Sequence, residues 1–170
     1  YQSAIKLNFR TDPTGLVGLM CLRKAKSGGL SSIVSAGTVY NEMLKKRPDL
    51  VQVLAGIIYR DRRGEIPEGR EPWYRLPVFN FRSGHLTTNY VRSTIEKAQR
   101  FNEVPRLTDI QREAFSLIES IAADPAFYLN MEFQPGDIQL LNNHYIMHSR
   151  TAYEDFPEPE NRRHLLRLWL

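Results

Sequence analysis

Residues 135–148 read PGDIQLLNNHYIMH, and they decide how the C-terminal part of the chain folds. Pro135-Gly136 predicts a turn, because proline and glycine are the residues that punctuate regular structure most strongly. The apolar residues after it predict two short strands, over 138–141 and 145–148. A further strand is predicted over 127–133. The tail of the chain is therefore expected to be a run of strands.

The N-terminal part carries strand patterns of its own. Residues 15–22 form a continuous apolar run, whose length favours a strand buried on both faces. Ser27-Gly28-Gly29 predicts a turn, and 31–35 a short strand after it. The last strand is predicted over 164–170.

Helical patterns fill the middle of the chain. Thr38 is expected to cap a helix that ends before Pro48, and short helices are predicted over 49–54 and 93–101. Thr108-Asp109-Ile110-Gln111 has the form of a capping box. The helix that it opens places its apolar residues at a 3.6-residue period on one face, and these are Ile110, Ala114, Leu117, Ile118 and Ile121.

A hairpin is predicted among these helices, with strands over 73–82 and 85–91 joined at Ser83-Gly84. Strands at both ends with helices inserted between them predict an α+β or mainly-β fold, built as a single domain over 1–170. A double-sheet jelly roll is one candidate, and it would place the early and late strands side by side.

Composition and charge narrow the class of protein. The chain has 170 residues, a formal net charge of +4 and a pI near 9.3. This mild basicity suits an anionic small substrate or weak nucleic-acid attraction and selects neither. No window approaches eighteen apolar residues, so no membrane span is expected. Cys21 is the only cysteine and no signal peptide precedes it, which favours a reducing, cytoplasmic location.

The densest basic stretch is Arg60-Asp61-Arg62-Arg63, which Gly64 and Pro67 follow. Charge and turn residues together predict a solvated loop. The alternative is contact with an anionic substrate or a partner. No aromatic residues interleave the stretch as they would in a groove for single-stranded nucleic acid, so no nucleic-acid partner is expected.

Arg10-Thr11-Asp12 lies on or beside a strand, where side chains two apart share a face. A His-x-Asp in that position, with a distant histidine such as His148, would complete the two-histidine-one-carboxylate set of non-haem Fe(II). Arg10 stands where the first histidine would be. A guanidinium has no lone pair to donate, so Arg10 is expected to pair with Asp12 and compete with a metal.

Other residues carry further chemical options. Arg163 and Arg167 are four apart on a predicted strand, and two arginines on one inward face are costly unless an anion binds them. His144 and His148 would suit zinc on a helix. On a strand they would lie roughly 13 Å apart, too far to share one ion.

Four stretches resemble the taurine dioxygenase-like family of Fe(II)/2-oxoglutarate oxygenases. They are GLMCLRKAKSGG over 18–29, PGDIQLLNN over 135–143, HSRTAYED over 148–155 and RHLLRLW over 163–169. The resemblance covers nearly the whole chain and implies a distorted double-stranded β-helix. It also implies that the chain lacks the N-terminal portion that completes the sheets in relatives.

The resemblance assigns roles to particular residues. Asp12 and His148 are implied to be metal ligands, with Arg10 in the place of the remaining ligand. Arg163 is implied to bind the distal carboxylate of 2-oxoglutarate together with Ser31. Arg167, which its strand face already singles out, is implied by its position to bind an anionic substrate.

Two functions are therefore weighed. The first is an Fe(II)/2-oxoglutarate-dependent dioxygenase that hydroxylates a small anionic or zwitterionic molecule with O2. The second is an inactive relative that serves as a binding or interaction module, since Arg10 replaces a ligand. Homo-oligomerisation is expected under either, because an incomplete sheet exposes strand edges.

Overall fold

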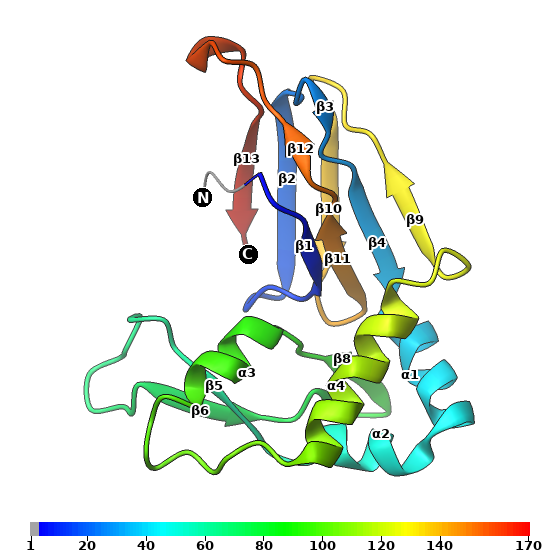
Figure 1. Cartoon of the computed structure of the whole chain (residues 1–170), viewed down its shortest axis with the longest axis vertical. Coiled ribbons are helices and arrows are strands. Elements are labelled where there is room, and N and C mark those ends of the chain that lie inside the picture. Colours follow the sequence, from blue (N-terminus) through cyan, green and yellow to red (C-terminus); the bar gives the residue numbers. More distant parts are fainter. Residues whose placement is uncertain (1–3) are drawn as a thin grey trace.

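The computed structural model describes residues 4–170, and it combines helices with antiparallel sheets (Figure 1). The helices are α1 Ala36–Lys46, α2 Pro48–Ala55, α3 Arg92–Ala98, α4 Asp109–Ala122 and the 3-10 turn η1 Pro159–Asn161. The strands are β1 Leu7–Arg10, β2 Leu16–Arg23, β3 Ser27–Gly28, β4 Ser31–Ser35, β5 Ile58–Asp61, β6 Trp73–Leu76, β7 Phe79–Arg82, β8 His85–Thr88, β9 Tyr128–Met131, β10 Ile138–Asn142, β11 Ile146–Arg150, β12 Tyr153–Glu154 and β13 His164–Trp169.

Two sheets bring the ends of the chain together. One has the order β1-β11-β4-β9 and the other the order β10-β2-β13. Each pairs an N-terminal strand with a C-terminal one, and Arg10 lies directly opposite His148. The prediction that early and late strands are neighbours is confirmed.

The four-stranded sheet separates the core from the opposite face. Because successive side chains on a strand point to opposite faces, Met147 and His148 face different ways. Met147 packs in the buried core with Val34 of β4 and with Met43 of α1 and Phe115 of α4. His148 is thereby directed away from the helices, toward the side of the sheet that carries polar residues.

The expectation that 15–22 is a strand buried on both faces is wrong in part. The strand forms as β2, but Met20 and Leu22 remain 37% and 36% exposed. Met20 pairs with Ile138 of β10 and Leu166 of β13, which are also exposed. The outer face of this sheet is thus an apolar surface. Self-association stays a prediction.

The first helix begins earlier than Thr38. β4 runs directly into α1, and Ser35 is the N-cap, because its extended backbone lets its Oγ accept a hydrogen bond from the Thr38 amide at 3.2 Å. Thr38 as the cap is therefore a wrong prediction. Ser35 has the same capping chemistry and lies three residues earlier.

The capping box that opens α4 is confirmed. The Gln111 amide donates to Thr108 Oγ1 at 3.3 Å, and the Thr108 amide donates to Gln111 Oε1 at 3.0 Å. The predicted face of α4 is buried at Ala114, Ile118 and Ile121, whereas Ile110 in the first turn is 44% exposed.

Replacing Thr108 with alanine is expected to lower the free energy of unfolding by about 1 kcal/mol, because one amide of the first turn loses its acceptor. Urea denaturation followed by circular dichroism measures the change. Ser116→Ala, on an exposed position of the same helix, is the matched control and should leave the midpoint nearly unchanged. Equal effects from the two variants would contradict the role of the cap.

The basic stretch is not a solvated loop at its start. Arg60 and Asp61 belong to β5, which pairs with β6, and both are buried. The Arg60 guanidinium donates through Nη1 and Nη2 to backbone carbonyl oxygens inside the protein; these belong to Ile58, Leu76, Pro77 and Asn89. Only the residues after Asp61 form a turn and loop, as expected.

The predicted strand over 73–82 divides in two. Pro77 interrupts it, since proline lacks the amide needed for strand pairing. β6 pairs with β5, and β7 pairs with β8 in a hairpin. The Ser83-Gly84 turn of that hairpin is confirmed, with φ of 50° and 79° at its two residues.

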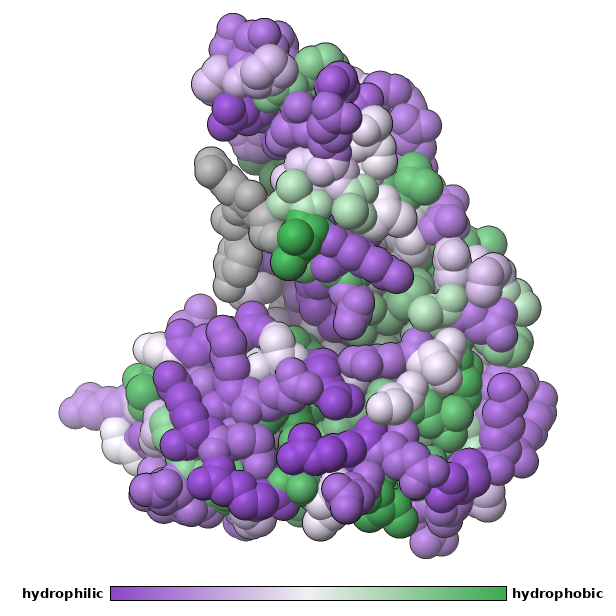
Figure 2. Space-filling model, viewed as in Figure 1, coloured by the Kyte–Doolittle hydropathy of each residue, from purple (hydrophilic) through white to green (hydrophobic). Residues whose placement is uncertain are grey.

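In residues 4–170 there is no helix both long enough and apolar enough to cross a membrane. Figure 2 shows hydrophilic side chains spread over most of the visible lower part of the molecule, where α3 and the β5–β6 pair lie in Figure 1.

Candidate metal centre

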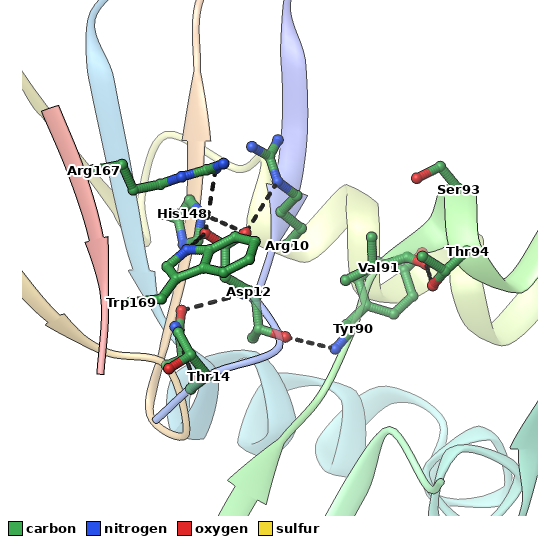
Figure 3. Close-up of polar contacts among 12 residues, drawn as sticks. Arg10, Asp12, Thr14, Tyr90, Val91, Ser93, Thr94, His148, Arg167 and Trp169 are labelled. Atoms are coloured by element: carbon green, nitrogen blue, oxygen red, sulfur yellow. Dashed lines mark hydrogen bonds and ion pairs between the residues drawn. The ribbon is translucent and has the colours of Figure 1, made fainter. Parts of the chain in front are cut away.

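β1 and β11 bring Asp12 and His148 together. Arg10 is the register partner of His148, and Asp12 follows the end of β1 by two residues. His148 Nε2 lies 3.8 Å from Asp12 Oδ1, and both side chains are almost wholly buried (Figure 3). The prediction that this carboxylate and this imidazole converge is confirmed. Their role as metal ligands stays a prediction.

Residues from the other end of the chain hold the Asp12 carboxylate. Trp169 Nε1 donates a hydrogen bond to Asp12 Oδ2 at 3.0 Å, and Arg167 Nη1 lies 3.7 Å from the same oxygen (Figure 3). The Asp12 amide donates to Asn143 Oδ1 at 3.3 Å. Sequence reasoning missed Trp169 and Asn143. The signal for Trp169 was its spacing of two from Arg167 on one strand.

Arg10 is an ion-pair partner of Asp12, as its sequence position predicts. Arg10 Nε lies 3.9 Å from Asp12 Oδ1, the oxygen that also faces His148. Burial lowers the pKa of the Arg10 guanidinium, and Asp12 opposes that shift. Repulsion from Arg167 adds to the lowering. Asp12 is therefore shared between guanidinium groups and the imidazole.

The surroundings of His148 keep its imidazole neutral at physiological pH. Burial lowers the pKa of His148 to about 4, and the nearby charges of Arg10 and Arg167 act in the same direction, while Asp12 opposes them. Nδ1 is buried without a hydrogen-bond partner among the described residues. The neutral ring is the form of histidine that binds metals.

The two donor atoms lie close enough for both to reach one metal ion. Donor atoms that each lie about 2.1 Å from one metal can be no more than about 4.2 Å apart, and His148 Nε2 and Asp12 Oδ1 are 3.8 Å apart. Within residues 4–170, no group of three or more His, Cys, Asp or Glu side chains could hold a metal ion. A zinc site with His144 is thus unsupported, because β11 is a strand and His144 is exposed outside it.

Arg163 lies in a separate small cavity beside the loop that joins β3 to β4. The cavity is lined by Cys21, Gly28, Gly29 and Arg163 among others. A Cβ on Gly29 would lie 3.3 Å from Arg163 Nε, and the φ of Gly29 is +73°, so this position requires glycine. Among the described residues the Arg163 guanidinium forms no salt bridge, and burial lowers its pKa.

Tyr153 separates Arg163 from a second arginine. The guanidinium carbons of Arg150 and Arg163 lie 4.6 Å and 5.3 Å from the centre of the Tyr153 ring. Arg150 follows His148 by two residues on β11, so the two side chains share a face of that strand. Arg150 therefore shares the strand face of His148 and contacts the ring that Arg163 also contacts, and sequence reasoning missed it.

Ser31 lies on the same face as His148. It is the register partner of Arg150, and its buried hydroxyl donates to Gln139 Oε1 at 3.4 Å. Gln139, which sequence reasoning did not single out, comes from the facing sheet. A shared contact of Ser31 and Arg163 with 2-oxoglutarate stays a prediction.

Arg163 and Arg167 have different surroundings, although one shared strand face was expected for them. Arg163 precedes β13, and the register shifts between His164 and Leu165. Arg167 turns toward Asp12, and its guanidinium carbon lies 4.5 Å from the centre of the Trp169 ring. The two cations therefore have different neighbours: Arg163 lines the small cavity, and Arg167 faces Asp12.

Residues 7–169 match the family described as taurine catabolism dioxygenase TauD, TfdA. The chain belongs to this family. It is 31% identical over 172 residues to the FR-33289 synthase of Streptomyces rubellomurinus, a match that covers 100% of this chain and 51% of the relative.

Solved structures share the fold. An asparagine oxygenase in complex with Fe(II), hydroxyasparagine and succinate superposes with a TM-score of 0.74 at 16% identity, over 99% of this chain and 50% of that one. The non-heme iron oxygenase OrfP in complex with Fe and alpha-ketoglutaric acid gives a TM-score of 0.65 at 15% identity, over 98% and 50%. The chain spans about half the length of these relatives.

Proposed function

We propose that this chain carries the metal and co-substrate sites of an Fe(II)/2-oxoglutarate-dependent dioxygenase. The substrate is a small anionic or zwitterionic molecule, hydroxylated with O2. The single observation that carries the proposal is the 3.8 Å approach of His148 Nε2 to Asp12 Oδ1 across β1 and β11. Family membership and the iron-containing solved relatives support it.

The architecture supports the same proposal. The sheets β1-β11-β4-β9 and β10-β2-β13 would be the two walls of a double-stranded β-helix, and residues 1–170 would act as one domain. Asp12 contacts His148 on one wall and Arg167 and Trp169 on the other. The metal would therefore lie between the walls, shielded from water.

Each residue has a defined task in this scheme. Asp12 and His148 would hold Fe(II), which supplies the oxidising chemistry when it is bound with 2-oxoglutarate and O2. Trp169 fixes the orientation of the Asp12 carboxylate through its hydrogen bond. Arg163, which forms no salt bridge with a described residue, would pair with the distal carboxylate of 2-oxoglutarate, with Ser31 as a second donor.

A second candidate function is a binding module without a metal. It is favoured by the position of Arg10, whose Nε lies 3.9 Å from the oxygen that a metal would use. In this form the Arg163 cavity would still take a dicarboxylate, and the apolar outer face of β10-β2-β13 would serve self-association.

Release of labelled CO2 from 2-oxoglutarate tests the first function against the second. The wild-type chain, reduced and supplied with Fe(II), is expected to release CO2 above the protein-free rate, and Asp12→Ala is expected to remove that activity. Arg10→His is measured in parallel. Activity that appears only in Arg10→His would contradict the enzymatic role of this chain and favour the binding module.

A further inference from the structure

An open, basic groove lies between the β5–β6 loop and α3. It encloses about 700 Å³ and is lined by Asp61, Arg63, Gly64, Ser93, Lys97 and Arg100. They belong to the end of β5 and the loop after it, and to α3 and the residues that follow it; Figure 1 shows β5 and α3 below the two larger sheets. The proposed metal centre uses none of them.

A buried carboxylate builds one wall of this groove. Asp61 is only 3% exposed, and its Oδ1 accepts a hydrogen bond from the Arg63 amide at 2.6 Å. Its Oδ2 lies 3.1 Å from Nη2 of Arg100. Asp61 therefore holds the backbone of Arg63 and the guanidinium of Arg100, while contributing almost no accessible negative surface.

The backbone at Arg63 is held in a conformation that L residues rarely adopt. Its φ is +56°, and Gly64 follows with φ of +86°. Strained residues of this kind persist where the surrounding structure determines them, and they cluster at binding sites. The turn directs the Arg63 guanidinium across the groove, where its Nη2 donates to Ser93 Oγ at 2.7 Å.

Positive charge in the groove exceeds negative charge. Arg63 and Lys97 form no ion pair with any residue in 4–170, and the only acid in the lining is the buried Asp61. Clustered cations with a hydroxyl between them bind phosphate-type anions by charge-assisted hydrogen bonds. The groove therefore has the donors for such an anion, and no accessible carboxylate among its described lining residues occupies them.

Two hydrogen bonds link the segment that precedes α3 to the segment that carries Asp12. The Thr11 amide donates to the Tyr90 carbonyl at 2.9 Å, and the Tyr90 amide donates to Thr11 Oγ1 at 3.0 Å. Thr11 lies between Arg10 and Asp12 in the sequence, and Ser93 lies three residues after Tyr90.

We propose that this groove binds the phosphate-like group of the substrate through Arg63, Lys97, Arg100 and Ser93, while the rest of the substrate extends toward Asp12 and His148. The second part of this proposal, in which the substrate reaches Asp12 and His148, rests on the proposed function. The anion site itself stands without the metal. Of the arginines in the basic stretch at 60–63, for which contact with an anionic substrate was the alternative prediction, Arg63 lines the groove, whereas Arg60 is buried among backbone carbonyls.

Calorimetric titration of the metal-free 170-residue chain with inorganic phosphate, at constant ionic strength, tests the site. Saturable binding is expected, with about a tenfold loss of affinity in Arg63→Gln and in Lys97→Gln, because each removes one charge-assisted hydrogen bond. Lys46→Gln, an exposed lysine at the end of α1, is the matched control and should bind like wild type. Lys97 is itself exposed, so its replacement should leave the fold unchanged.

Other outcomes would overturn the proposal. Absent or unsaturable phosphate binding would do so, as would equal binding by the groove variants with a loss in Arg167→Gln. Acetate that binds as tightly as phosphate would reject the phosphate-like class, and a single-stranded oligonucleotide that binds more tightly would reject a small molecule. The titration contains no metal, so failed iron chemistry together with intact phosphate binding would refute the oxygenase and leave the groove.

Discussion

Replacing Arg10 with histidine is expected to tighten Mn(II) binding about a hundredfold, or about 2.7 kcal/mol. The substitution adds an imidazole at the register partner of His148 and removes a cation 3.9 Å from the carboxylate oxygen that faces the metal position. Mn(II) is a stand-in for Fe(II) that does not oxidise in air during the measurement. Its free concentration is followed by electron paramagnetic resonance.

Arg10→Gln separates the two causes in that prediction. It removes the positive charge and adds no imidazole, so it should recover only part of the gain. A full gain from glutamine would assign the effect to charge alone. No gain from either variant would contradict the view that Arg10 occupies a ligand position.

Replacing Arg163 with glutamine is expected to weaken 2-oxoglutarate binding at least about tenfold, because the distal carboxylate would lose a bidentate charged partner. The guanidinium is partly buried beside Gly29 and forms no salt bridge with a described residue. Equilibrium binding of labelled 2-oxoglutarate in the presence of Mn(II) measures the effect.

Arg162→Gln is the matched control for Arg163→Gln. Arg162 is the preceding residue, exposed, and its guanidinium donates to the Phe156 and Pro157 carbonyls. It should leave the affinity for 2-oxoglutarate unchanged. An unchanged affinity in Arg163→Gln would reject the assigned role of Arg163.

Local patterns predicted much of the fold. The capping box at Thr108 and the turn at Ser83-Gly84 formed as expected, because their chemistry depends on neighbours within a few residues. The position of the first cap was missed, since Ser35 and Thr38 have equivalent hydroxyls and only the end of β4 selects Ser35.

Burial was harder to predict, because it depends on distant partners. A run such as Arg60-Asp61-Arg62-Arg63 predicts a solvent-exposed loop, yet Arg60 is buried and donates to a carbonyl as distant in the sequence as that of Asn89. β2 resembles a fully buried strand, yet one face of it is exposed alongside Ile138 and Leu166.

The sequence predicted the central residues of the candidate site but not the residues that surround them. Asp12 and His148 meet, and Arg10 pairs with Asp12, as the sequence indicated. The contact of Arg167 with Asp12 was not predicted. Trp169 and Arg150 have no unusual motif, and their roles appear only when β13 and β11 bring them beside Asp12 and Tyr153. Such contacts depend on strand register, which no short pattern encodes.

The most direct test is an Mn(II) titration of wild type, His148→Gln and His144→Gln. The two histidines lie four residues apart, and only His148 faces Asp12. Wild type and His144→Gln are expected to bind Mn(II) with the same affinity, and His148→Gln to lose saturable binding. Undiminished binding by His148→Gln, or a loss confined to His144→Gln, would contradict a metal centre built on Asp12 and His148.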